Sequence, residues 1–241
     1  MMNARLFSLV SVTTLLLLNC GCGRLPGKPT PAEVPVVPKQ VRNFAELYRL
    51  NCAGCHGPEG KGNGAMALAN PVYLAIVSDD TLRRVTAEGV PGTLMPPFAA
   101  SAGGELVDAQ VEVLVHGIRG WAKPEALQGM TPPPYAATAK GDAQRGSEAF
   151  AIACASCHGA DGKGTTTTGS IVDGSFLALV SDQDLRTTVI AGRPDLGHPD
   201  WQHCVPGRAL TDSEVTDVVA WLASHRLLNP GQPYPTSQTK P

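Results

Sequence analysis

Two segments of the chain contain the same reactive side chains at the same spacing: two cysteines one helical turn apart, with a histidine directly after the second. The residues are Cys52, Cys55 and His56 in the first segment and Cys154, Cys157 and His158 in the second. This spacing is typical of c-type haem attachment, in which both thiols bond to the porphyrin vinyl groups and the imidazole becomes the proximal iron ligand. The sequence therefore predicts two covalently attached haem c groups.

Paired cysteines can also bind zinc or act as a redox dithiol. The two pairs begin 102 residues apart, which is far beyond the spacing of one zinc ribbon. A thioredoxin-like dithiol has no need of the adjacent histidine. Four of the seven cysteines are therefore assigned to haem attachment.

The residues after each motif repeat as well. The run 55–62 returns at 157–164 with its histidine and three glycines in place, and the run 78–83 returns at 181–186. Glycines after the histidine let the backbone pass close to a porphyrin edge. Helix starts are predicted at Asn43, before the first motif, and at the Thr211 capping box near the end of the second copy. The chain thus contains two copies of one helical unit.

These motifs and their duplication resemble the diheme c-type cytochromes that consist of two tandem class I cytochrome c domains, over about residues 42–228. The resemblance implies a mostly α-helical fold, with several helices around each haem and the first and last helices of a domain packed together. Trp221 is expected to pack against the helix that contains Phe150. Gly117 occupies the matching position of the first domain and predicts looser packing there.

The resemblance also implies a ligand on the second face of each iron. Met95 is followed by two prolines, lies 39 residues after His56, and matches the distal-ligand loop of class I cytochromes c. Carrying the repeat offset of 103 residues forward places His198 where Met95 lies in the first copy. We therefore predict that Met95 binds the first iron and that the second iron is bound by both His158 and His198.

Other residues remain alternatives for these ligand positions. Met66 and Met130 are the rivals in the first domain, and His203 is the rival in the second. His198 could also be an ordinary loop residue that faces a five-coordinate iron. His116 lies off the apolar stripe of its predicted helix and is expected to be a surface residue.

The N-terminal segment is typical of an exported protein. Residues 1–19 are interpreted as a lipoprotein-type signal peptide, because the apolar run 6–18 is short for a membrane span. The segment 17–20 resembles a bacterial lipobox, which makes Cys20 the expected lipidation site and Cys22 the alternative. Since c-type attachment occurs outside the cytoplasm in bacteria, we expect the protein on the periplasmic side of a membrane, held there by a lipid anchor.

Proline-rich segments separate the predicted domains. We expect a tether at 20–41, cytochrome c domain 1 at 42–122, a linker at 123–141, cytochrome c domain 2 at 142–228, and a disordered tail at 229–241.

The composition and the resemblance to diheme cytochromes together limit the functions that the chain could have. A net charge of −2 over 241 residues excludes nucleic acid as a natural partner. The resemblance implies an electron carrier, not an enzyme, that passes single electrons between redox partners such as a quinol-oxidising complex, an oxidase or a dehydrogenase. A diheme peroxidase-like enzyme or a haem-based sensor is the alternative, and the peroxidase would need an iron with an open position.

The two sites are expected to differ in reduction potential. A thioether favours ferrous iron, whereas a second imidazole favours ferric iron. The second predicted domain is also more acidic, with a net charge of −5 against −2 for the first. Nearby negative charge stabilises the ferric state, so the first site is expected to have the higher potential.

Replacing Cys154 and Cys157 by alanine should halve the haem content of the purified protein, because one of two attachment sites is then lost. A pyridine haemochrome assay on denatured protein measures this content. Finding a single haem in the unchanged protein would contradict the duplicated attachment.

Overall fold

The computed structural model describes residues 30, 34 and 36–227, and within these ranges helices are the only regular secondary structure. The chain divides into two units, Met1–Gln40 and Val41–Pro241. The described part of the first unit contains the short 3-10 helix η1 (Pro38–Gln40). The predicted signal peptide, Cys20, Cys22, most of the tether and the C-terminal tail lie outside the described residues. Within the described ranges, no helix is both long and apolar enough to cross a membrane.

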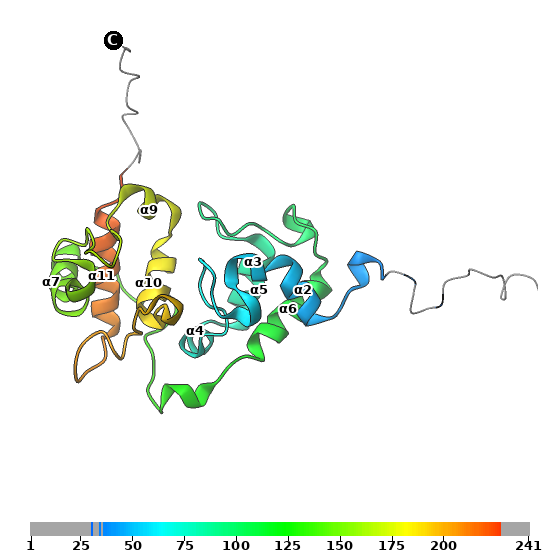
Figure 1. Ribbon diagram of the computed structural model, residues 1–241, viewed down its shortest axis with the longest axis horizontal. Coiled ribbons are helices and arrows are strands. Elements are labelled where there is room, and N and C mark those ends of the chain that lie inside the picture. The colour runs from blue at the N-terminus through cyan, green and yellow to red at the C-terminus, as the bar shows by residue number, and fades with distance from the viewer. Residues whose placement is uncertain (1–29, 31–33, 35, 228–241) are drawn as a thin grey trace, which may run out of the picture. The chain divides into compact units, whose positions relative to one another are not determined.

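The second unit contains two successive sets of helices, coloured blue to green and green to orange in Figure 1. The first set is α2 (Phe44–Asn51), α3 (Ala53–His56), η2 (Pro58–Gly60), α4 (Pro71–Ile76), α5 (Asp79–Glu88), η3 (Ala100–Ala102) and α6 (Asp108–Arg119). After η4 (Pro124–Leu127), the second set is α7 (Ala143–Ala153), α8 (Ala155–His158), α9 (Gly174–Leu179), α10 (Asp182–Ala191), η5 (Pro194–Leu196) and α11 (Asp212–Ser224). The predicted mostly helical, duplicated fold is confirmed.

Short polar side chains fix where these helices begin. Asn43 accepts a hydrogen bond from the backbone N–H of Glu46 at the start of α2. Thr211 and Glu214 exchange side-chain and backbone hydrogen bonds at the start of α11, so the predicted capping box is confirmed. Such caps satisfy N–H groups that have no partner inside the helix.

In each set the first helix packs against the last, α2 against α6 and α7 against α11. The Trp221 ring lies 4.2 Å from the Phe150 ring between centroids, which confirms the predicted contact. In the first domain, Trp121 takes the neighbouring aromatic position and lies 5.2 Å from Phe44 and 5.0 Å from Tyr48.

The contact between α2 and α6 is less extensive than that between α7 and α11, as predicted from Gly117, although the two domains exchange an aromatic residue and a glycine across this helix pair. In the first domain Phe44 of α2 covers Gly117 of α6, where an added Cβ would lie 2.0 Å from the ring. In the second domain the matching positions hold Gly146 of α7 and Trp221 of α11. A Cβ at Gly146 would lie 2.0 Å from the Asp217 carbonyl oxygen. Both contacts are therefore tight.

An arginine after or near the end of the last helix joins it to an earlier turn in both domains. Arg119 does this in the first domain and Arg226 in the second. Each donates to two backbone carbonyls and pairs with one carboxylate: Leu74, Val77 and Asp79 in the first domain, and Leu177, Val180 and Asp182 in the second. This repeated arrangement fixes the turn that leads into α5 and α10.

The end of the predicted linker lies against the second domain. Arg186 of α10 is buried and donates hydrogen bonds to the carbonyls of Pro134 and Tyr135. It also pairs with Asp212 and donates to Thr216 on α11. The proline-rich segment is therefore held at its end by one buried guanidinium.

Replacing Gly146 by alanine should lower the free energy of unfolding by about 1–3 kcal/mol, because the added methyl group meets the α11 backbone. Denaturant unfolding followed by circular dichroism measures the change. Gly169 is a matched control, since no atom lies within 4 Å of a Cβ there, and Gly169→Ala should leave the unfolding free energy nearly unchanged. Equal effects of both substitutions would contradict the tight contact.

Candidate haem sites

The first attachment segment follows the end of α2 and forms α3. Cys52 is buried, Cys55 is exposed, and the backbone N–H of His56 donates to the Cys52 carbonyl at 2.9 Å. The two thiols thus lie on one helical turn, as attachment requires. Burial raises the pKa of the Cys52 thiol to about 12. A redox dithiol needs a readily formed thiolate, so this environment does not suit the dithiol alternative.

The second attachment segment has the same backbone. Cys154 is half-buried and Cys157 exposed, and the His158 N–H donates to the Cys154 carbonyl at 3.0 Å. Burial raises the pKa of Cys154 to about 12 as well. Among the described residues, no three His, Cys, Asp or Glu side chains gather in a way that could hold a zinc ion.

The ring of His56 is oriented by a backbone carbonyl. Its Nδ1 atom lies 2.7 Å from the carbonyl oxygen of Met66. A histidine that donates through one ring nitrogen keeps the lone pair of the other free for a metal. Burial lowers the pKa of His56, so the imidazole stays neutral as a metal ligand must. Met66, a rival ligand in sequence, thus contacts His56 through its backbone.

The ring of His158 faces that of His198, which belongs to the loop after α10. Their centroids are 5.8 Å apart and the ring planes meet at 47°. The Nδ1 atoms of both residues are buried and have no hydrogen-bond partner within the described part of the chain. Burial is the main cause of the lowered pKa of both imidazoles. Two neutral, half-buried imidazoles therefore lie opposite one another.

This ring pair fits a metal held between the two imidazoles. Metal–nitrogen bonds of about 2 Å on either side place two ring centroids on the order of 6 Å apart. The alternative ligand, His203, is exposed, and its Nδ1 lies 2.6 Å from an Asp200 carboxylate oxygen. The geometry therefore supports His198 over His203.

Met95 and His198 occupy equivalent places in two equivalent loops. Each loop follows a glycine with a positive φ, Gly89 at 70° and Gly192 at 69°. The backbone N–H of Val90 donates to the Met95 carbonyl at 3.0 Å, and the N–H of Arg193 donates to the His198 carbonyl at the same distance. The loop geometry is thus the same although the side chain differs.

A Cβ at either loop glycine would collide with the returning backbone. It would lie 2.5 Å from the Met95 oxygen at Gly89 and 2.8 Å from the His198 oxygen at Gly192. Met95 itself is half-buried, whereas Met130 and His116 are exposed. The expectation that His116 is a surface residue is confirmed.

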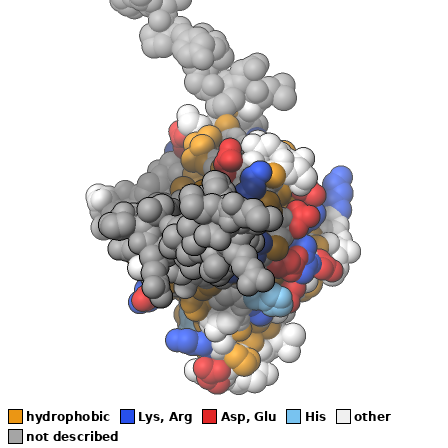
Figure 2. Space-filling model, turned by 90° about the vertical axis from the view of Figure 1, so that its right-hand side faces the viewer, with side chains coloured by type: hydrophobic (Ala, Val, Ile, Leu, Met, Phe, Trp, Pro, Cys, Tyr) orange, Lys and Arg blue, Asp and Glu red, His pale blue; other side chains and the backbone are white. Residues whose placement is uncertain are grey.

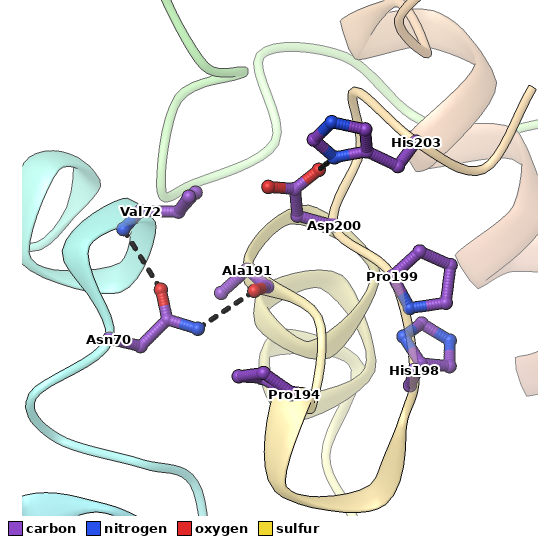
Figure 3. A pocket seen from close by; sticks show the side chains of 8 residues that line it. All are labelled: Asn70, Val72, Ala191, Pro194, His198, Pro199, Asp200 and His203. Carbon is purple, nitrogen blue, oxygen red and sulfur yellow. Dashed lines mark hydrogen bonds and ion pairs between the residues drawn. The ribbon is translucent and has the colours of Figure 1, made fainter. Parts of the chain in front are cut away.

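Two further residues support the His198 loop. Trp201 is fully buried, and its backbone joins Ile190 and Leu210 by hydrogen bonds. Asn70 of the first domain donates from Nδ2 to the carbonyl oxygen of Ala191 at 2.8 Å, across the contact between the domains (Figure 3). Sequence reasoning missed Asn70, because nothing local marks it except its role as the cap of α4.

A pocket of about 280 Å³ lies beside this loop, between the two domains (Figure 3). Eight residues line it: Asn70, Val72, Ala191, Pro194, His198, Pro199, Asp200 and His203. The pocket is thus part of the surroundings of His198.

Two cytochrome family models match the chain, one on each domain. The model described as cytochrome c oxidase, cbb3-type, subunit III matches residues 39–116, and the model described as cytochrome c matches residues 143–226. Each matched range contains one Cys-x-x-Cys-His segment.

Curated relatives are named as cbb3-type cytochrome c oxidase subunit CcoP. The subunit of Rubrivivax gelatinosus is 32% identical over 142 residues, which cover 58% of this chain and 41% of the relative. That of Rhodobacter capsulatus is 28% identical over 206 residues, which cover 80% of this chain and 65% of the relative. The matches therefore span between 41% and 65% of the length of these relatives.

A solved structure, the Kuenenia stuttgartiensis reducing HAO-like protein complex, aligns with 80% of this chain and 100% of its own at 18% identity and a TM-score of 0.42. That similarity is too low to inform the site.

The two family models, the CcoP relatives and the duplicated helical fold agree with one another. The chain is a diheme c-type cytochrome, which consists of two tandem cytochrome c domains and binds two covalently attached haem c groups.

Proposed function

We propose that this chain is an electron-transfer subunit that passes single electrons through its two haems within, or next to, an oxidase complex of the cbb3 type. The observation that carries the proposal is the pair of equivalent loops that present different side chains, Met95 and His198. The choice of an oxidase as partner is supported by the family model on residues 39–116 and by the names of the relatives.

The proposed residues of each site follow from the arrangement above. Cys52 and Cys55 would attach the first haem, and His56 and Met95 would bind its iron. Cys154 and Cys157 would attach the second haem, and His158 and His198 would bind its iron. The haem irons supply the one-electron chemistry when bound.

The protein contributes half-buried ligands that are held in place by its backbone. The Met66 carbonyl holds the His56 ring in one orientation, and burial keeps His56, His158 and His198 neutral. Ligands that move little between the two oxidation states keep the reorganisation during electron transfer small. Such rigid ligands suit a carrier better than a catalyst, which must open a coordination position.

The ligand difference also gives the electron a preferred direction. The Met95 thioether favours the ferrous state, whereas the imidazole of His198 and the acidic second domain favour the ferric state. An electron that arrives at the second domain would therefore move downhill to the first. The first domain is then the exit toward the acceptor.

Attachment to the periplasmic face of a membrane through acyl chains at Cys20, and the domain boundaries given above, stay predictions. Both are compatible with a tethered carrier. A proline-rich tether of about 17 residues, 24–40, at about 3.1 Å per residue would reach roughly 50 Å, enough for a domain to contact partners beside its anchor.

Replacing His198 by alanine should convert the second haem from low-spin to high-spin in the ferric state, because one axial ligand is lost. The reduced variant should also bind carbon monoxide, which the unchanged protein should resist. His203→Ala is the matched control and should change neither property. Absorption and electron paramagnetic resonance spectra report the spin state, and a change in the control alone would assign the ligand to His203.

A tagged full-length chain, extracted from its membranes in mild detergent, should co-purify with a complex that reduces oxygen. Oxygen consumption should stop when the haems of the chain are left unattached by changing Cys52, Cys55, Cys154 and Cys157 to alanine. Recovery of the holoprotein alone, or with a complex that does not consume oxygen, would contradict the proposed partner.

A further inference from the structure

The loop that presents His198 also contacts the first domain through a charged residue. The Nη1 atom of Arg193 donates to the carbonyl oxygen of Gly64 at 3.1 Å. Asp195 lies against Gly62, where an added Cβ would come within 2.8 Å of its carboxylate. Gly62 and Gly64 belong to the glycine-rich loop that follows His56. The two haem-binding loops therefore meet at Arg193 and Asp195.

Arg193 is connected to proposed ligands of both irons. Its backbone exchanges two hydrogen bonds of 3.0 Å with the backbone of His198. On the other side, Gly64 lies two residues before Met66, whose carbonyl orients His56. A displacement of Arg193 would therefore shift the backbone of His198 and the loop whose carbonyl orients His56.

The charges of this contact are poorly exposed. Arg193 and Asp195 form an ion pair at 2.6 Å, with only 13% and 17% of their side-chain surfaces accessible. Asp195 as a residue lies at the surface, so water screens the pair in part and its charges act mainly on the groups nearest to them.

This ion pair is present in one copy of the repeat only. The offset of 103 residues places Val90 at the position of Arg193 and Gly92 at the position of Asp195. The loop of the first domain therefore keeps the backbone geometry without the charges. The pair lies where the second loop contacts the first domain. Its charges can therefore act on both proposed haem sites.

We propose that the Arg193–Asp195 pair is a positioning element shared by both haem sites, which fixes the two ligand loops against each other and whose two charges act on both reduction potentials with opposite signs. The inference rests on the proposed function, since it takes His56 and His198 as ligands. A positive charge near an iron favours its ferrous state and a negative charge favours its ferric state. The pair therefore balances two opposing effects on each iron.

Two single variants separate this electrostatic role from a purely structural one. Arg193→Gln leaves the Asp195 carboxylate unpaired and should shift both potentials downward. Asp195→Asn leaves the guanidinium unpaired and should shift both upward. The double variant should return both close to the values of the unchanged protein. Potentiometric titration of the holoprotein, followed by absorption, measures all four proteins.

Arg208→Gln is the matched control, because Arg208 pairs with Glu214 at 2.7 Å in the same domain, at the start of α11 and away from Gly62 and Gly64. It removes the same charge and should move neither potential. If Arg193→Gln does not fold, the upward shift in Asp195→Asn still tests the proposal.

The outcomes separate the inference from the proposed function. Shifts of the two single variants in the same direction, or no shift in either, would overturn the shared electrostatic role while the two-haem carrier stands. An unchanged protein without two six-coordinate haems would instead overturn the ligand assignment, and the inference with it.

Discussion

In the second domain the half-buried rings of His158 and His198 face each other with centroids 5.8 Å apart, and the buried Nδ1 atom of each has no hydrogen-bond partner among the described residues. Two neutral imidazoles at this separation fit one metal ion held between them. The loop after α10, the glycine at its start and the fully buried Trp201 behind it all hold His198 at this distance from His158. The second domain is therefore built around a group that the side chains alone do not supply.

The first domain has an equivalent loop and an equivalent histidine, but different side chains at the proposed site. Its loop returns through Gly89 with the same backbone hydrogen bond, but presents Met95. Its proximal histidine has a hydrogen-bonded Nδ1, whereas that of His158 is unpaired within the described residues. Hydrogen bonding to the second ring nitrogen raises the basicity of a ligating imidazole. With the proposed ligands, the two sites would differ on both sides of the bound iron, which supports the proposal of two unequal electron-transfer sites.

Much of this organisation could be predicted from the sequence because it depends on local patterns. The Cys-x-x-Cys-His spacing, the cap at Asn43, the capping box at Thr211 and the offset from Met95 to His198 are visible without any tertiary information. The assignment of Met95 and His198 as iron ligands stays a prediction, which the matching geometry of the two loops supports. The contact of Trp221 with Phe150 followed from helix pairing in the family.

Features that depend on contacts between distant segments could not be predicted. Phe44 and Gly117 of the first domain are replaced by Gly146 and Trp221 in the second. This exchange depends on which residues of the paired helices come into contact, and a glycine in the sequence of one helix does not indicate it. In the same way, Arg193 has no sequence signal that points to Gly64, 129 residues earlier in the chain. Tertiary packing decided both.

The central claim is that the two irons have different axial ligands and therefore different potentials. A potentiometric titration of the unchanged protein beside His198→Met tests it most directly. We expect two waves in the unchanged protein, and in the variant we expect the lower wave to move up toward the higher one while a second methionine–ferric charge-transfer band appears. A single wave in the unchanged protein, or a variant whose lower wave stays in place, would contradict the account.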